Sequence, residues 1–187
     1  MTLSTVPPAA RWLGLAGLLP FYLQALAIWI LVSGEGPDGA GPGPVALQWA
    51  GFLVFSQLLY AAVVVSFIGA VQWGLAMANL GWEVQRQPVS TRINDGGDGQ
   101  PRLEGATRQF LWSVVPALFG WADVLVFQFL RIGWVELVIM MILFVAAFAA
   151  DRNAVRYGLG PEWYLELRKV LTIGVLVALG VTVFAWF

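Results

Sequence analysis

Three charged residues lie inside or beside long apolar stretches and are the first candidates for chemistry. Asp123 and Glu136 each interrupt such a stretch, and Arg131 lies between them. Ionisable residues at membrane depth are rare and commonly functional. With Gln128, these three could form a proton-accepting or headgroup-binding site. Alternatively, charges at the end of a hairpin pair with one another or extend to the membrane interface.

A second set of polar side chains lies on the uncharged stretch 57–82. These residues could line an apolar pocket for a quinone, tetrapyrrole pigment or lipid. They could equally make helix–helix hydrogen bonds, worth about 0.6 kcal/mol each in a membrane. The set comprises Ser66, Gln72, Trp73 and Asn79.

The composition excludes several classes of chemistry. The chain has no Cys and no His, which removes thiolate metal sites and the commonest general base. We find no phosphate-binding loop, nucleophile elbow, dinucleotide fingerprint or zinc motif. The net charge of -1 argues against nucleic acid as a partner. We therefore predict a protein that is not an enzyme, with no catalytic residue, no metal and no cofactor held by its own side chains, although contact with a lipid, quinone or pigment stays open.

The hydrophobic content predicts an all-α integral membrane protein. Of the 187 residues, 59% are hydrophobic and 11% are charged, whereas a soluble domain is about one quarter charged. We expect a single transmembrane domain, 1–187, built as a bundle of five helices. The first apolar stretch is too long for a signal-peptide core and should remain as a span. The predicted spans are about 12–32, 45–82, 108–128, 132–150 and 169–187, with Pro20 kinking the first and Pro116 inside the third.

The stretch from Val45 to Trp82 has no charge in 38 residues. As one helix it would be about 57 Å long, nearly twice the hydrocarbon thickness, so it is either one long helix or a tight hairpin. If it crosses the membrane once, nine Lys and Arg residues lie on one side and Arg131 alone lies on the other. This bias places the N-terminus in the cytoplasm and the C-terminus outside. A bacterial inner membrane is the expected location.

Small residues recur at every fourth position of the long second helix. Such a ridge lets another backbone approach closely, which promotes helix association in lipid. A chance run in a chain rich in Ala and Gly is the alternative. The predicted helix-packing ridge is Ala62, Ser66, Ala70, Gly74 and Ala78.

Mixed charges and aromatic residues cluster around the last predicted loop. They suit headgroup anchoring or docking to a neighbouring subunit, or simply a solvated membrane edge. Other Trp residues near span ends, such as Trp186, are expected interface anchors. The predicted inner-face docking residues are Arg152, Arg156, Trp163, Tyr164, Arg168 and Lys169.

Several motifs together resemble one membrane family. Ser66-Phe67-Ile68-Gly69 followed by Trp73-Gly74 is similar to the signature of the uncharacterised five-span family named domain of unknown function 3429, which includes a mitochondrial transmembrane protein. The resemblance implies an inner membrane of bacteria or mitochondria and no established activity. Gln72 departs from the basic residue or His expected before the Trp-Gly pair. Supporting stretches are Ala16–Phe21, Ser113 with Pro116, Leu118 and Trp121, and Pro161 with Trp163-Tyr164, Leu167-Arg168 and Leu171-Thr172.

Two functions fit these features. The first is a non-catalytic accessory or assembly subunit of a larger respiratory or photosynthetic membrane complex, whose partners are membrane lipids and other subunits. The small size, short loops and packing ridge suggest it. The alternative is a binding protein or carrier for a small hydrophobic molecule, suggested by the aromatic content and the polar residues of the central helix.

Overall fold

The structure is a computed structural model. It describes residues 6–36, 39, 41–86, 100–130, 132–156 and 161–186, and within these ranges the side chains of residues 79–86 and 100–108 are not described. The helices are α1 (Pro8–Ala16), α2 (Leu19–Ser33), α3 (Pro44–Arg86), α5 (Gln100–Leu130), α6 (Trp134–Arg156) and α7 (Glu162–Ala185).

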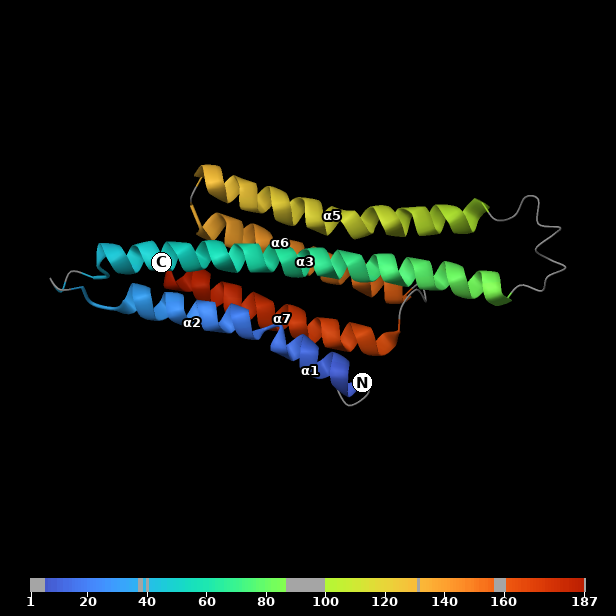
Figure 1. Cartoon of the computed structure of the whole chain (residues 1–187), viewed down its shortest axis with the longest axis horizontal. Coiled ribbons are helices and arrows are strands. Elements are labelled where there is room, and N and C mark those ends of the chain that lie inside the picture. The colour runs from blue at the N-terminus through green and yellow to red at the C-terminus, as the bar shows by residue number, and fades with distance from the viewer. Residues whose placement is uncertain are drawn as a thin grey trace.

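The predicted five-helix membrane bundle is confirmed. Five stretches of the described chain are long and apolar enough to cross a membrane, with α1 and α2 together forming the first. All of them run along the long axis of the molecule, and the two termini lie toward opposite ends of that axis (Figure 1). Which end faces the cytoplasm stays a prediction.

The first span is broken close to the predicted kink at Pro20. Helix α1 ends at Ala16, and a turn at Gly17 and Leu18 precedes α2. Proline has no N–H and clashes with the preceding turn, so carbonyl groups there lose their helical partner. The hydroxyl of Tyr60 on α3 donates to the Gly17 carbonyl at 2.9 Å. A neighbouring helix therefore satisfies a backbone acceptor at the break, as membrane depth requires.

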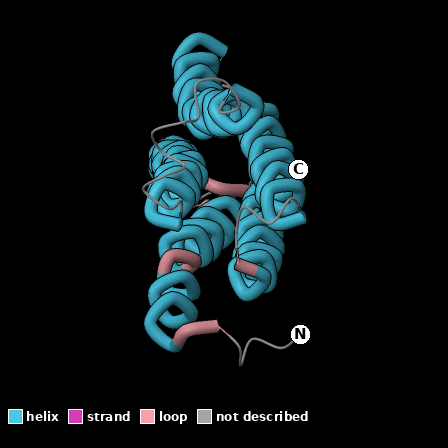
Figure 2. The backbone as a smooth tube through the Cα atoms, turned by 90° about the vertical axis from the view of Figure 1, so that its right-hand side faces the viewer, coloured by secondary structure: helices cyan, strands magenta, loops and turns pink. Residues whose placement is uncertain are grey.

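Helix α3 is the long uncharged helix predicted from the sequence, and it continues without a break for 43 residues. It packs against α2, α5 and α6, while α7 packs against α2 and α6. Viewed along the bundle, the helices form a flattened cross-section with α5 at one edge and α1 at the other (Figure 2). The position of α3 lets it carry side chains to three neighbouring helices.

Helices α3 and α5 approach most closely at two glycines. A Cβ atom on Gly69 would lie 2.1 Å from the carbonyl oxygen of Ser113, and one on Gly120 would lie 3.3 Å from the Cα of Ala62. Pro116 follows Ser113 by less than one turn, and its ring also faces Gly69. Only glycine permits the first of these backbone contacts, so Gly69 fixes where the two helices meet.

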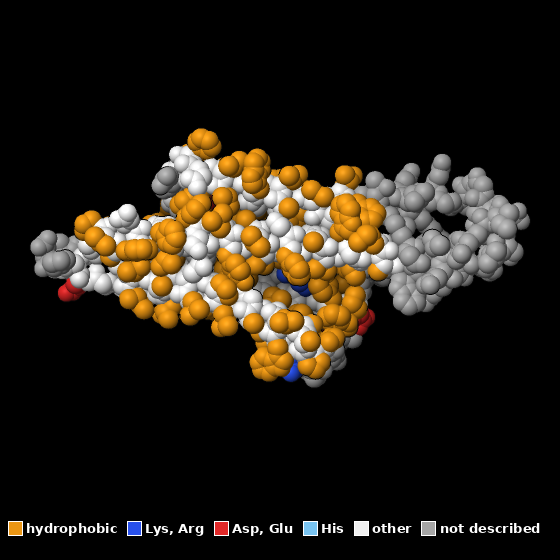
Figure 3. Space-filling view, in the orientation of Figure 1, with side chains coloured by type: hydrophobic (Ala, Val, Ile, Leu, Met, Phe, Trp, Pro, Cys, Tyr) orange, Lys and Arg blue, Asp and Glu red, His pale blue; other side chains and the backbone are white. Residues whose placement is uncertain are grey.

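Apolar side chains cover the outside of the bundle as well as its centre. The core includes Phe21, Leu58, Met140 and Phe144, whereas Phe67, Phe129 and many other large apolar residues are exposed. Figure 3 shows hydrophobic atoms distributed along the described part of the viewed face, with Lys or Arg atoms visible in a hollow just below α3. An apolar exterior suits contact with lipid tails.

Candidate functional site

Helix α6 carries the centre of a buried polar cluster, Asp151, which is 1% exposed. The Nε of Arg168 on α7 donates to Oδ2 of Asp151 at 2.6 Å, and the Tyr164 hydroxyl donates to the same oxygen at 3.3 Å. The Nε2 of Gln72 on α3 donates to Oδ1 at 2.5 Å. Gln109 on α5 in turn donates to Oε1 of Gln72 at 3.2 Å. We call these five residues the Asp151 network.

The Asp151 network joins α3, α5, α6 and α7 through side chains. Its carboxylate accepts three donors and faces a guanidinium, so its charge is balanced and its acceptors are used. Such a fully satisfied group holds helices in register. Arg168 Nη2 and Thr172 Oγ1 are buried on α7 without a described hydrogen-bond partner.

A second polar group lies closer to the other end of the bundle. Asp123 on α5 is 3% exposed, and Gln57 on α3 and Glu136 on α6 are fully buried. The contacts Phe55–Phe127 and Ala62–Gly120 bracket Asp123 and place it at the level of Gln57.

Glu136 lies at the same level. Helices α3 and α6 run in the same direction, and Gln57 and Glu136 each precede the bonded pair Gln72–Asp151 by fifteen residues. Asp123 and Glu136 are close enough for their charges to repel. We call Gln57, Asp123 and Glu136 the carboxyl layer.

The two polar groups lie at different depths. Fifteen residues of helix separate Gln57 from Gln72, a rise of about 22 Å. This is less than the roughly 30 Å thickness of a hydrocarbon core. The carboxyl layer and the Asp151 network therefore cannot both lie in the headgroup regions.

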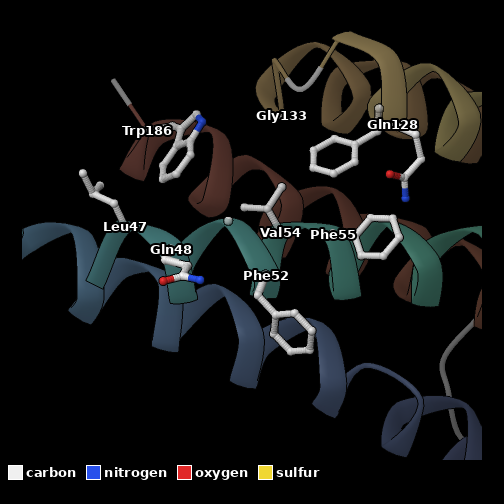
Figure 4. A pocket seen from close by; sticks show the side chains of 10 residues that line it. Leu47, Gln48, Phe52, Val54, Phe55, Gln128, Gly133 and Trp186 are labelled. Carbon is white, nitrogen blue, oxygen red and sulfur yellow. The ribbon is translucent and has the colours of Figure 1, made fainter. Parts of the chain in front are cut away.

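A cavity of about 460 Å³ opens beside the carboxyl layer at the C-terminal end of the bundle. In Figure 4, Val54 and Phe55 of α3 and Trp186, the residue after α7, border the same space, whereas Phe52 points toward α2. Its lining is mostly apolar and aromatic, with two amide side chains. We call it the side cavity, and it is lined by Leu47, Gln48, Gly51, Phe52, Val54, Phe55, Phe127, Gln128, Gly133 and Trp186.

An aromatic pair lies between the side cavity and the carboxyl layer. The rings of Phe55 and Phe127 stack with centroids 5.4 Å apart and an interplanar angle of 17°. Both rings line the cavity, and Asp123 lies one helical turn from Phe127. Among the described residues, no group of three His, Cys, Asp or Glu side chains could hold a metal ion.

The structure divides the two sets of residues predicted as ligand or proton sites differently from the sequence. Asp123 and Glu136 come together, Gln128 lines the side cavity, and Gln72 belongs to the Asp151 network. Trp73 is 43% exposed and contacts the ring of Phe110. The remaining members are Ser66, whose hydroxyl bonds the carbonyl of Ala62 on its own helix, and Arg131 and the side chain of Asn79, which lie outside the described residues.

The predicted packing ridge is used within the chain along only part of its length. Ala62 contacts Gly120, but Ala70, Gly74 and Ala78 are exposed. A Cβ on Gly74 would meet no atom within 4 Å. The ridge turns away from the neighbouring helices because a spacing of four residues drifts around a helix with 3.6 residues per turn.

One of the predicted inner-face docking residues needs correction. Arg168 is 5% exposed and bonded to Asp151, so it is not on the surface. A cation in a low-dielectric interior is stable only beside a counter-charge, and Asp151 supplies it. The other predicted residues are more accessible: Arg152, Arg156 and Lys169 are exposed, and Trp163 and Tyr164 are half-buried.

Sequence reasoning missed most of the side cavity, two of the five residues of the Asp151 network and one of the three residues of the carboxyl layer. Gln57, Gln109 and Asp151 were not among the predicted site residues. The signal for Gln57 was its spacing from Gln72, since fifteen residues are close to four helical turns and place both on one face. The cavity residues carry no such signal, because apolar residues around a space look like any other membrane-helix surface.

The helices and buried polar groups define a multi-pass α-helical membrane protein. The family model described as "Protein of unknown function (DUF3429)" matches residues 6–184, so the chain belongs to this family, as the sequence motifs predicted. It is also similar to Transmembrane protein 69 of Xenopus tropicalis, with 27% identity over 176 residues, which cover 91% of this chain and 52% of the relative. The chain thus spans about half the length of this curated relative. No solved structure matches.

Proposed function

We propose that this membrane protein binds one small lipid-soluble molecule in the side cavity. The observation that carries the proposal is the cavity itself, whose volume of about 460 Å³ falls in the range of roughly 300–1,000 Å³ typical of small-molecule sites. Flat aromatic walls and two amides suit a ring-bearing or chain-bearing molecule with one polar end. A quinone, a lipid or a pigment of that kind fits this description.

The position of the cavity supports a ligand that arrives through lipid. Its walls come from α3, from α5 and the turn after it, and from the end of α7. Large apolar residues around it are exposed, including Leu47 and Phe52. A molecule dissolved in the bilayer can therefore reach the cavity without crossing water.

The test is to identify molecules that stay bound to the protein in mild detergent by native mass spectrometry. We expect one defined small molecule at a ratio of one per chain. The variant Gly51→Phe should abolish its retention, because Gly51 lines the cavity and a Cβ atom there would meet no atom within 4 Å, so the ring can occupy the ligand's space. Gly180→Phe on α7 is the matched control, since Gly180 is equally open but outside the cavity.

Two results would contradict ligand binding in the cavity. One is a wild-type protein that carries bulk lipid alone in proportion to the membrane composition. The other is a defined molecule that Gly51→Phe retains as well as Gly180→Phe does. Thermal unfolding of both variants in the same detergent establishes that they are folded.

The exposed end of the small-residue ridge supports a second candidate, an accessory or assembly subunit of an energy-transducing inner-membrane complex. Ala70, Gly74 and Ala78 offer a face on which another transmembrane helix could pack closely. Blue-native electrophoresis of native membranes tests it. Gly74→Leu should release the protein from its assembly, whereas Gly180→Leu should not. Wild-type protein that migrates as a lone chain would count against this role.

A further inference from the structure

The carboxyl layer contains more acceptor atoms than the described side chains around it supply with donors. Both oxygens of Asp123, both of Glu136 and the Oε1 of Gln57 are buried without a described hydrogen-bond partner. The amide nitrogen of Gln57 already donates to the Phe21 carbonyl at 3.2 Å. Five oxygens without a described partner thus lie at one level on three helices.

The surrounding helices supply no described counter-charge. The hydroxyl of Thr182 on α7 bonds the Ala178 carbonyl of its own helix, and Tyr60 on α3 donates to Gly17. Among the described side chains, no Lys or Arg lies at this level of α2, α3, α5, α6 or α7; Arg131 is outside the described residues.

The Asp151 network shows what a satisfied carboxylate looks like in this protein. Asp151 is as buried as Glu136, yet it accepts three hydrogen bonds and pairs with Arg168. Two unbalanced negative charges at the depth of Asp123 and Glu136 would cost several kcal/mol each. No described side chain supplies the positive charge that two ionised carboxylates at this depth would need.

We propose that the carboxyl layer is a binding site for a proton or another monovalent cation within the membrane. A proton converts one carboxyl into a donor for the other or for Gln57 Oε1. An alkali cation would instead be coordinated by the same oxygens. The site is separate from the side cavity, so it does not depend on ligand binding there.

The experiment uses dicyclohexylcarbodiimide, an apolar reagent that modifies protonated carboxyl groups in membranes. Wild-type protein in lipid nanodiscs is treated over a range of pH, and the labelled residues are located by mass spectrometry. Label should appear on Asp123 or Glu136 and fall about ten-fold for each pH unit above the midpoint. Asp151 is the internal control and should stay unlabelled, because it is paired with Arg168.

Added salts distinguish the two cations. Protection by sodium or potassium, but not by choline, at constant pH indicates an alkali-cation site; equal labelling in all three salts indicates a proton site. Asp123→Asn and Glu136→Gln assign the reactive carboxyl. The proposal is overturned if neither residue is labelled at any pH, or if labelling ignores both pH and salt. Because the decisive result comes from wild-type protein, a variant that fails to fold does not affect it.

Discussion

At the scale of single residues, burial alone does not say what a charged side chain does. Asp151 and Glu136 lie on the same helix and are both almost fully buried. Asp151 is surrounded by donors from two other helices, whereas Glu136 has none described. The first arrangement favours structural stability, and the second favours the exchange of a cation.

Breaking the ion pair of Asp151 should therefore destabilise the bundle. The Asp151→Asn substitution leaves the buried guanidinium of Arg168 without its counter-charge, at a cost of about 3–5 kcal/mol in the free energy of unfolding. Unfolding by a denaturing detergent measures this loss.

A double replacement provides the control for this prediction. Asp151→Leu combined with Arg168→Met removes both charges and should recover much of the lost stability. A double variant as unstable as Asp151→Asn would mean that the ion pair is not the reason for the loss.

At the scale of helices, the buried residues and the small residues of α3 follow two different spacings. Its buried residues recur at spacings of three or four, which follow the helical turn. The small residues recur at a constant spacing of four and drift off that face. The buried face is Ala50, Val54, Gln57, Leu58, Ala61, Val65, Ile68, Gly69, Gln72 and Ala76.

Gly69, and not a member of the predicted ridge, makes the closest contact of α3. Gly69→Ala should cost about 1–3 kcal/mol or more, because the new methyl group would overlap the carbonyl oxygen of Ser113. Gly74→Ala is the matched control. It should be neutral or slightly stabilising, since its methyl group meets no atom and alanine favours helix. Thermal unfolding in one detergent compares the two, and equal losses would refute this account of the helix contact.

At the scale of the whole molecule, the sequence predicted the architecture well and the sites poorly. Five apolar stretches, a break near Pro20 and one long uncharged helix are consequences of composition, and the structure has all three. The pairing of Asp151 with Gln72 and Arg168 could not be predicted. It depends on the axial position of α6 relative to α3 and of α7 relative to α6. Those positions are set by packing contacts between the helices, which a single sequence does not reveal.

The orientation of the bundle remains a prediction from charge. Nine basic residues on one side favour a cytoplasmic N-terminus and a C-terminus outside. Reporter fusions at each terminus measure this directly: a cytoplasm-active reporter should work at the N-terminus, and an export-dependent one at the C-terminus. The same compartment for both termini would contradict the single crossing of α3.

The separation of about 22 Å between Gln57 and Gln72 has a mechanical consequence. In a hydrocarbon core about 30 Å thick, moving the protein along the bilayer normal hydrates one polar group and buries the other more deeply among the lipid tails. The protein therefore has a preferred depth in the bilayer. A thinner membrane would bring water nearer both to Asp123 and Glu136 and to Arg168. In short-chain lipids, both the carboxyl layer and the Asp151 network should therefore become hydrated before any helix unfolds.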